Sequence, residues 1–364
     1  MEDVHRKYME RCLQLARLGA GNVAPNPMVG AVLVHEDRII GEGYHRQYGQ
    51  AHAEVNCLAS VRPEDEALIE QSVLYVSLEP CAHFGKTPPC ADLIIRKKIP
   101  KVVVGCRDPF VEVNGKGIEK LLMAGREVIT GVCEEECREL NKIFFTFNIF
   151  HRPYIILKWA QTADAKIAGT HGRLHISNEY ANRAVHRWRS ETSAILVGTN
   201  TALLDDPSLT TRLWSGPNPV RLVIDLHLRL PSGLHLFDGS VPTIVFNLLQ
   251  HTLPTDGEIN KLTGRPFYYQ VTEDVSIGAQ LVNALYRLKL TSVLVEGGSR
   301  LLQSFIDEDC WDEARVITNS SLFIGEGLPA PVLSHHKETG EEKIFSDTVH
   351  TYRREEPGSI TTYS

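Results

Sequence analysis

The first third of the chain alternates between segments with helical spacing of apolar residues and short apolar runs. In residues 4–19 apolar side chains recur every three or four positions, which predicts a helix. Residues 29–34 and 38–43 read as a hairpin around Glu36-Asp37. Alternating strands and helices imply a sheet with helices on its faces. Further strands are expected at 73–78, 101–105 and 128–132, and further helices at 52–61, 90–98, 117–125 and 134–150.

The segment His151-Arg152-Pro153 separates this pattern from a second α/β pattern. We place a domain boundary there, which gives domains of residues 1–149 and 150–364. The last residues, 337–364, are polar, and their sequence gives no basis for predicting structure there. In the second half strands are expected at 154–159, 194–198, 220–225, 243–246 and 292–296, and helices at 179–190, 277–289 and 300–307.

Composition indicates an ordinary globular protein of two domains. The chain has 364 residues, 43% hydrophobic and 23% charged, which is too apolar for a disordered chain. The net charge is −7 and no basic block stands out, which argues against a protein dedicated to nucleic acid. The start lacks a signal-peptide core, and no apolar run approaches the ~18 residues of a membrane helix. We therefore expect a cytoplasmic protein whose eight cysteines are buried thiols or metal ligands.

Three short segments carry the residue types of a catalytic zinc site: His52-Ala53-Glu54, Pro80-Cys81 and Pro89-Cys90. One imidazole and two thiolates leave a fourth position for water, which Glu54 can face without binding the metal. If His83 were a fourth ligand, the site would be closed and structural. Cys90 opens a predicted helix, and a helix N-terminus lowers the pKa of a thiol.

A second cysteine pair, Cys133 and Cys137, lies four residues apart at the start of a predicted helix. These thiols could bind a metal, but free cysteines at such positions are more often buried bystanders. We expect the bystander role.

The order His-x-Glu, Pro-Cys and a second Cys resembles the zinc-dependent cytidine and deoxycytidylate deaminase superfamily. The common form has two residues between the cysteines, whereas eight separate Cys81 from Cys90. This longer loop resembles the deaminase domain of the bifunctional deaminase/reductase family of riboflavin biosynthesis. Segments 25–30, 43–45, 108–109 and 114–117 match the same family, so the resemblance covers residues 5–150.

The resemblance implies a cytidine-deaminase-like, three-layer α/β/α domain that hydrolytically deaminates 2,5-diamino-6-(5-phosphoribosylamino)pyrimidin-4(3H)-one. One Zn²⁺ per chain would be held by His52, Cys81 and Cys90, and Glu54 would be the catalytic acid and base. Surface, turn or capping roles remain alternatives for several expected substrate contacts. Those contacts are Asn26, His45, His83, Lys86, Thr87 and Asp108.

In the second half, residues 292–302 read as strand, glycine turn and helix. Backbone N–H groups at such a turn can hold a phosphate, but an ordinary tight turn fits the pattern equally well. The second half resembles the reductase domain of the same bifunctional family, which is related in fold to dihydrofolate reductase. The matching segments are 157–158, 162–164, 176–177, 194–198, 205–210, 223–225 and 295–298.

The second resemblance implies that NADPH reduces the ribosyl side chain to ribityl, giving 5-amino-6-(5-phosphoribitylamino)uracil. Arginine at the substrate contacts suits a ribose phosphate. The implied substrate contacts are Arg173, Arg189, Leu209, Arg212 and Glu296. The implied NADPH contacts are Ala160, His175, Thr201, Asp205, Gly298, Ser299 and Arg300.

Two positions depart from the reductase pattern: Ala165 stands where the family has glycine, and His175 where it has tryptophan. A monofunctional deaminase with a weakened or inactive reductase domain is therefore an alternative. A tRNA or DNA base deaminase is another, although the loop between Cys81 and Cys90 and the lack of a basic stripe argue against it. A non-catalytic zinc module is a third. The resemblance also implies a homo-oligomer, a dimer or tetramer, that acts on a small molecule without nucleic-acid or membrane partners.

Overall fold

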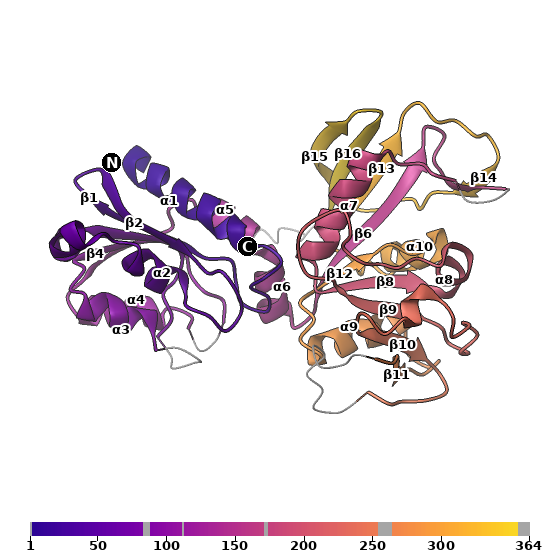
Figure 1. Ribbon diagram of the computed structural model, residues 1–364, viewed down its shortest axis with the longest axis horizontal. Helices are drawn as coiled ribbons and strands as arrows, with labels where there is room; N and C mark the ends of the chain where they lie inside the picture. Colours follow the sequence, from indigo (N-terminus) through magenta and orange to yellow (C-terminus); the bar gives the residue numbers. More distant parts are fainter. Residues whose placement is uncertain (1, 83–87, 111–112, 171–173, 254–263, 356–364) are drawn as a thin grey trace, which may run out of the picture. The chain divides into compact units, whose positions relative to one another are not determined.

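The computed structural model describes residues 2–82, 88–110, 113–170, 174–253 and 264–355 (Figure 1). It divides the chain into two compact units, Met1–His151 and Arg152–Ser364. Within the described ranges, no helix has the length and apolar character needed to cross a membrane.

The first unit is built on a five-stranded sheet with the order β2-β1-β3-β4-β5. The antiparallel hairpin of β1 and β2 turns through Glu36 and Asp37, with φ of 44° and 63°. Two successive left-handed residues match the twist of a two-residue hairpin, so the predicted hairpin is confirmed. β3, β4 and β5 run parallel. The strands are β1 (Gly30–His35), β2 (Arg38–Tyr44), β3 (Val73–Leu78), β4 (Lys101–Cys106) and β5 (Glu127–Thr130).

Helices cover both faces of this sheet, as the alternating pattern predicts (Figure 1). Side chains alternate between the faces along each strand. Val32, Tyr75 and Val103 pack with one helix layer, α1 (Glu2–Ala16), α5 (Glu134–Leu140) and α6 (Lys142–Phe150). Neighbouring strand residues pack with the other layer, α2 (Ala53–Ala59), α3 (Cys90–Arg96) and α4 (Lys116–Met123). Two 3-10 helices, η1 (Arg17–Gly19) and η2 (Pro63–Gln71), complete the unit.

The expectation of one helix over residues 134–150 is wrong, because the helix breaks at Asn141 between α5 and α6. Asn141 is 2% exposed, and its side chain bonds the backbone of Met28 twice. Its Oδ1 accepts from the Met28 N–H at 2.8 Å, and its Nδ2 donates to the Met28 carbonyl at 2.9 Å. This pairing across 113 residues is a tertiary contact that helical periodicity does not reveal.

The second unit is built on a nine-stranded sheet with the order β11-β10-β9-β8-β12-β6-β13-β16-β15. Neighbours from β11 to β13 are parallel, and the last two pairings are antiparallel. A separate two-stranded sheet pairs β7 (Lys166–Gly169) with β14 (Gly327–Pro329). The main strands are β6 (Tyr154–Thr162), β8 (Ala194–Gly198), β9 (Val220–Ile224), β10 (Thr243–Asn247), β11 (Phe267–Gln270), β12 (Ser292–Val295), β13 (Glu313–Asn319), β15 (His336–Ile344) and β16 (Asp347–Arg354).

Both faces of the central parallel strands are buried, which explains their nearly continuous apolar sequences. α9 (Ile277–Arg287) and α10 (Ser299–Asp307) pack against one face. α8 (Thr199–Asp205) packs against the other face, and α7 (Glu179–Glu191) packs against Ile317 and Val349 farther along the sheet. A 3-10 helix, η3 (His235–Phe237), lies near α8.

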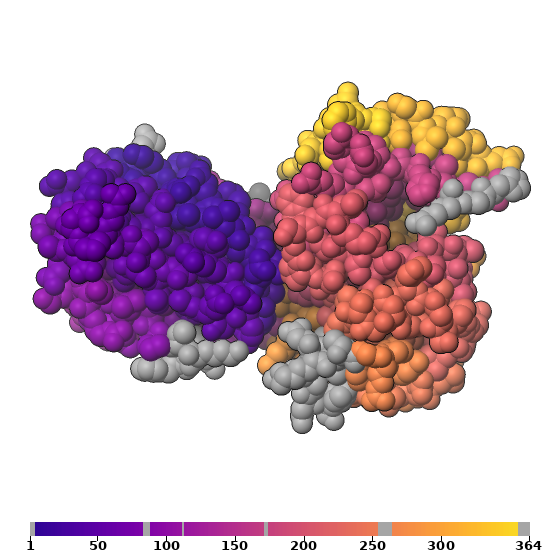
Figure 2. Space-filling model, viewed as in Figure 1, coloured from indigo at the N-terminus to yellow at the C-terminus, as the bar shows by residue number. Residues whose placement is uncertain are grey.

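The C-terminal stretch, for which the sequence offers no prediction, contains β15 and β16, which form a hairpin at the surface of the second unit (yellow in Figure 2). Eight of the nine residues of β15 are exposed, so no apolar alternation marks the strand. Its register comes instead from pairing with β16. The sequence also gave no prediction for η2, α8, β7, β11, β13 or β14.

Replacing Asn141 with alanine should destabilise the first unit by about 1–3 kcal/mol, because two backbone groups of Met28 lose their partners. All four tryptophans lie in the second unit, so their fluorescence reports that unit alone. In urea, we expect Asn141→Ala to move the far-UV circular dichroism transition of the first unit and leave the fluorescence transition in place. Asn148→Ala, which removes only a bond to the Phe144 carbonyl within α6, is the control. Equal shifts in both variants would contradict the tertiary role of Asn141.

Candidate active site

The predicted zinc ligands meet at one end of the first sheet. His52 directly precedes α2, and Cys90 is the first residue of α3. The His52 Nδ1 lies 3.7 Å from the Cys81 Sγ and 3.4 Å from the Cys90 Sγ. The three donor atoms all lie within 4.8 Å of one another. One nitrogen and two sulfurs at this spacing are a donor set that fits Zn²⁺.

The two thiols lie too close to ionise independently. A hydrogen bond from Cys90, with help from His52, lowers the pKa of Cys81 to about 4. The neighbouring Cys81 and burial raise the pKa of Cys90 well above its usual value. In the metal-free pair one thiol therefore ionises at the expense of the other, and the stabilisation that the start of α3 offers the Cys90 thiolate is opposed by its like-charged neighbour. A divalent cation between the two sulfurs would stabilise both as thiolates.

Glu54 lies in the first turn of α2 and is 3% exposed. Burial, reinforced by the negative charge of Cys81, raises its pKa to about 6. A carboxyl group that gains and loses a proton near neutral pH is suited to acid and base catalysis. Its position two residues from His52 places it beside the three-residue cluster.

Three of the expected deaminase contacts lie around this cluster. His45 is 3% exposed; its Nδ1 lies 3.1 Å from the Ala51 carbonyl, and its Nε2 lies 3.2 Å from the Asn26 Nδ2. The His45 ring meets the His52 ring edge-on at 5.4 Å. Asp108 follows β4, and burial is the main cause that raises its pKa to about 7. His83, Lys86 and Thr87 lie outside the described residues.

In the second unit, Arg189 and Glu296 form a buried two-point ion pair. The Arg189 Nε and Nη2 donate to the two Glu296 carboxylate oxygens at 2.8 and 2.7 Å. Lys158 Nζ lies 3.9 Å from the same carboxylate. Although burial opposes ionisation, Arg189 and Lys158 lower the pKa of Glu296 to about 2. Sequence reasoning missed Lys158 as a site residue; a lysine in the apolar strand β6 was the available signal.

Arg212 and Leu209 lie on the loop beside this ion pair. The Arg189 Nη1 donates to the Thr210 carbonyl at 3.2 Å, and the Arg212 Nη1 donates to the Thr210 hydroxyl at 3.1 Å. The backbone N–H of Arg212 donates to His186 at 2.9 Å. Leu209 is 2% exposed. The structure thus brings Arg189, Leu209, Arg212 and Glu296 together, while Arg173 lies outside the described residues.

Two of the expected cofactor contacts, Thr201 and Gly298, touch directly where α8 and α10 begin. The Gly298 N–H donates to the Thr201 hydroxyl at 2.8 Å. A Cβ at Gly297 would lie 2.8 Å from the Gly198 nitrogen, so the turn after β12 needs glycine to pack against the end of β8. The other expected contacts are dispersed: Ala160 is on β6, Asp205 ends α8, Ser299 bonds the Pro329 carbonyl, and Arg300 is exposed.

The two departures from the reductase pattern have different structural settings. Ala165 has a φ of 55°, in the left-handed region that favours glycine, so the family's glycine has a conformational reason. An alanine there costs about 1 kcal/mol relative to glycine. His175 is exposed, immediately before the buried Ile176.

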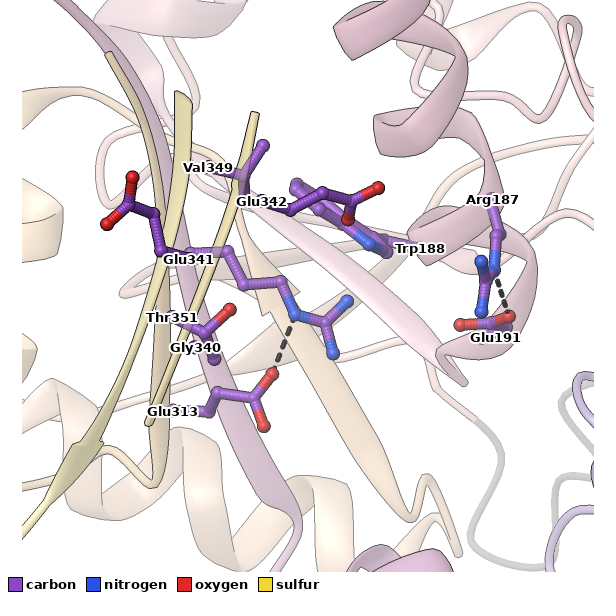
Figure 3. A pocket seen from close by; sticks show the side chains of 10 residues that line it. Arg187, Trp188, Glu191, Glu313, Gly340, Glu341, Glu342, Val349 and Thr351 are labelled. Carbon is purple, nitrogen blue, oxygen red and sulfur yellow. Dashed lines mark hydrogen bonds and ion pairs between the residues drawn. The ribbon is translucent and has the colours of Figure 1, made fainter. Parts of the chain in front are cut away.

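Other polar features of the described residues lie away from these sites. A groove of about 310 Å³ between α7 and strands β13, β15 and β16 includes no expected site residue (Figure 3). Glu338, Glu341 and His350 also lie within 4.8 Å of one another on the C-terminal hairpin, but none is buried. Cys137 is buried in the core beside α1, and among the described residues neither Cys133 nor Cys137 belongs to a three-residue donor cluster.

Two protein-family models match the chain. Residues 2–106 match the cytidine and deoxycytidylate deaminase zinc-binding region, and residues 153–338 match the RibD C-terminal domain. The Aquifex aeolicus riboflavin biosynthesis protein RibD is 41% identical over 331 residues, covering 90% of each chain. The Bacillus amyloliquefaciens protein of the same name is 39% identical over 309 residues, covering 84% of this chain and 82% of its relative.

Solved structures match nearly the whole chain. The Thermotoga maritima diaminohydroxyphosphoribosylaminopyrimidine deaminase/5-amino-6-(5-phosphoribosylamino)uracil reductase superposes with a TM-score of 0.85 at 36% identity, covering 97% of this chain and 99% of that one. Acinetobacter baumannii RibD superposes with a TM-score of 0.81 at 29% identity and the same coverage. These matches confirm the expected fold class, a cytidine-deaminase domain followed by a reductase domain related to dihydrofolate reductase.

The purified chain should carry one zinc ion per molecule, and Cys90→Ala should remove it, because the site then has only two protein ligands. Zinc per chain is measured by mass spectrometry after gel filtration. Cys133→Ser, which replaces a thiol outside the cluster, should retain zinc at the wild-type level. Retention of stoichiometric zinc by Cys90→Ala would show that the ligands lie elsewhere.

Proposed function

This chain belongs to the RibD family and is a riboflavin biosynthesis deaminase and reductase; on that premise we propose how its residues divide the two reactions. Residues 1–149 would carry the deaminase and residues 150–364 the reductase. The observation that supports this assignment best is the His52, Cys81 and Cys90 cluster beside a buried carboxyl group, Glu54.

In the first reaction, 2,5-diamino-6-(5-phosphoribosylamino)pyrimidin-4(3H)-one loses an amino group to water. His52, Cys81 and Cys90 would hold Zn²⁺, whose Lewis acidity makes water a stronger nucleophile near neutral pH. Glu54 takes a proton from the attacking water and delivers it to a ring nitrogen; it then moves the remaining hydroxyl proton of the water adduct to the amino group, which leaves as ammonia as the carbonyl forms. A pKa near 6 lets the same carboxyl group serve as base and then as acid.

The substrate ring would lie against the polar groups around the cluster. Asn26, His45 and Asp108 offer donors and acceptors to the ring edges, and the burial of His45 and Asp108 strengthens the bonds they make. His83, Lys86 and Thr87 would complete this pocket, with Lys86 suited to the phosphate. A ring held by several fixed polar groups presents its amino carbon to Glu54 in one orientation.

In the second reaction, the ribosyl group is reduced at C1 and opens to a ribityl chain, giving 5-amino-6-(5-phosphoribitylamino)uracil. NADPH supplies the hydride when bound. Arg212 and Arg189 would hold the phosphate: the Arg212 guanidinium fork matches phosphate oxygens, and Arg189, whose own fork binds Glu296, adds positive charge beside it. Arg173, Leu209 and Glu296 would complete the substrate contacts, with Glu296 fixing Arg189 through the two-point ion pair.

The ends of β8 and β12 offer a fitting cradle for NADPH. These strands are parallel neighbours, so α8 and α10 begin side by side at one edge of the sheet, where helix N-termini favour an anionic group. Gly297 lets the turn after β12 pack on the end of β8, and glycine at 198 and 298 adds no side chain at this edge, which suits a pyrophosphate. The residues we assign to NADPH are Ala160, His175, Thr201, Asp205, Gly298, Ser299 and Arg300.

Glu54→Gln should lower the rate of ammonia release by at least about 100-fold, because an amide of the same size cannot carry the proton. Zinc content should stay at the wild-type level, as should NADPH oxidation with the deaminated substrate supplied directly. Glu64→Gln, at an exposed position in η2, is the control and should keep full deaminase activity. Near-normal deamination by Glu54→Gln would refute this mechanism.

Arg212→Ala should raise the KM of the reductase for its phosphorylated substrate roughly 10- to 100-fold, the effect of one charge-assisted hydrogen bond. With the dephosphorylated substrate, the variant and the wild type should have equal KM values. NADPH consumption at 340 nm measures both. If the wild-type chain fails to oxidise NADPH, it is a monofunctional deaminase; if both substrates are affected equally, Arg212 does not bind the phosphate.

A further inference from the structure

Glu79 is a buried carboxylate that neither proposed reaction uses. It follows β3 directly, two residues before Cys81, and is 4% exposed. Its backbone N–H donates to the Cys106 carbonyl at 3.0 Å, which extends the pairing of β3 and β4 by one bond. The side chain therefore starts at the end of the sheet where Cys81 and Asp108 leave it.

Four backbone N–H groups donate to the Glu79 carboxylate. Oε2 accepts from Asp108 at 3.3 Å and Gly115 at 3.0 Å, and Oε1 accepts from Gly117 at 2.9 Å and Ile118 at 3.3 Å. Buried charge is costly unless it is compensated in this way. One side chain thus holds both ends of the segment from Asp108 to Ile118.

The start of α4 depends on this carboxylate. Gly115 precedes the helix and has no side chain to cap it, so Glu79 accepts from N–H groups at the first turn. A negative charge is also favoured at a helix N-terminus. A Cβ at Gly117 would lie 1.9 Å from the Pro80 carbonyl oxygen, so the helix start packs directly on the residue between Glu79 and Cys81.

From this geometry we infer that Glu79 is a positioning residue of the deaminase, which fixes Asp108 relative to the zinc ligand Cys81. Cys81 and Asp108 come from different strands, and the Glu79 side chain is a direct link between their segments. The inference rests on the proposed substrate contact of Asp108. A structural role alone would stabilise α4 without affecting how Asp108 meets the substrate.

The test substitutes Glu79→Gln, Asp108→Asn and both together. An amide has one acceptor oxygen, so about two of the four N–H groups would face its NH₂ group instead. We expect Glu79→Gln to raise the deaminase KM roughly 10- to 100-fold, as expected for a displaced substrate contact, with zinc content unchanged. Reductase activity on the deaminated substrate, measured on the same sample, reports the second unit. Glu119→Gln, an exposed acid in the first turn of α4, is the matched control with wild-type KM.

The double variant separates positioning from stability. If Glu79 acts through Asp108, the double variant should have the KM of Asp108→Asn alone. If the KM increases of the two single variants multiply in the double variant, or if Glu79→Gln loses zinc, the inference is overturned and Glu79 is a structural residue. If the KM is normal for Glu79→Gln but raised for Asp108→Asn, the positioning role of Glu79 is overturned and the substrate contact of Asp108 stands. A normal KM for Asp108→Asn would overturn the proposed substrate contact as well.

Discussion

The clustering of several acidic side chains inside the protein is the constraint that organises the first unit. Three carboxyl groups and two thiols meet at one end of its sheet: Glu54, Glu79, Asp108, Cys81 and Cys90. Isolated negative charges cannot be buried cheaply, so each is handled differently. Glu79 is surrounded by four backbone N–H groups. Glu54 and Asp108 have pKa values raised to about 6 and 7. The two sulfurs share His52 and, in our proposal, a divalent cation.

The second unit treats a buried carboxylate in the opposite way. Glu296 is flanked by Arg189 and Lys158, which hold its pKa near 2 and keep it ionised. A permanently charged Glu296 can orient an arginine but cannot exchange protons near neutral pH. Glu54 is buried beside the Cys81 thiolate, which raises its pKa, so it can gain and lose a proton near neutral pH. The same functional group therefore suits proton transfer in one unit and positioning in the other, and its surroundings decide which.

The sequence predicts those parts of the fold and site that local pattern encodes. The zinc-ligand cluster was foreseeable because its residues border predicted helices. The buried strands were foreseeable because each is a short, continuous apolar run. Contacts between segments that are distant in the sequence could not be foreseen in this way. Asn141 breaks a helix to bind Met28, and Glu79 bonds a loop about thirty residues away. The hairpin of β15 and β16 escaped prediction because its exposed strand has no apolar alternation. For Asn141 and Glu79 the decisive partner is remote in the chain, whereas the hairpin forms between neighbouring segments that show no apolar pattern.

His52 and Cys90 are 38 positions apart, yet their side chains share one small cluster. A metal ion held between them would act as a reversible cross-link, closing a long loop that the denatured chain leaves open. Since the ion binds the native form, free zinc above its Kd would raise the melting temperature of the first unit roughly with the logarithm of its concentration. A cell starved of zinc would then lose the hydrolytic half of this enzyme before the half that consumes reducing equivalents.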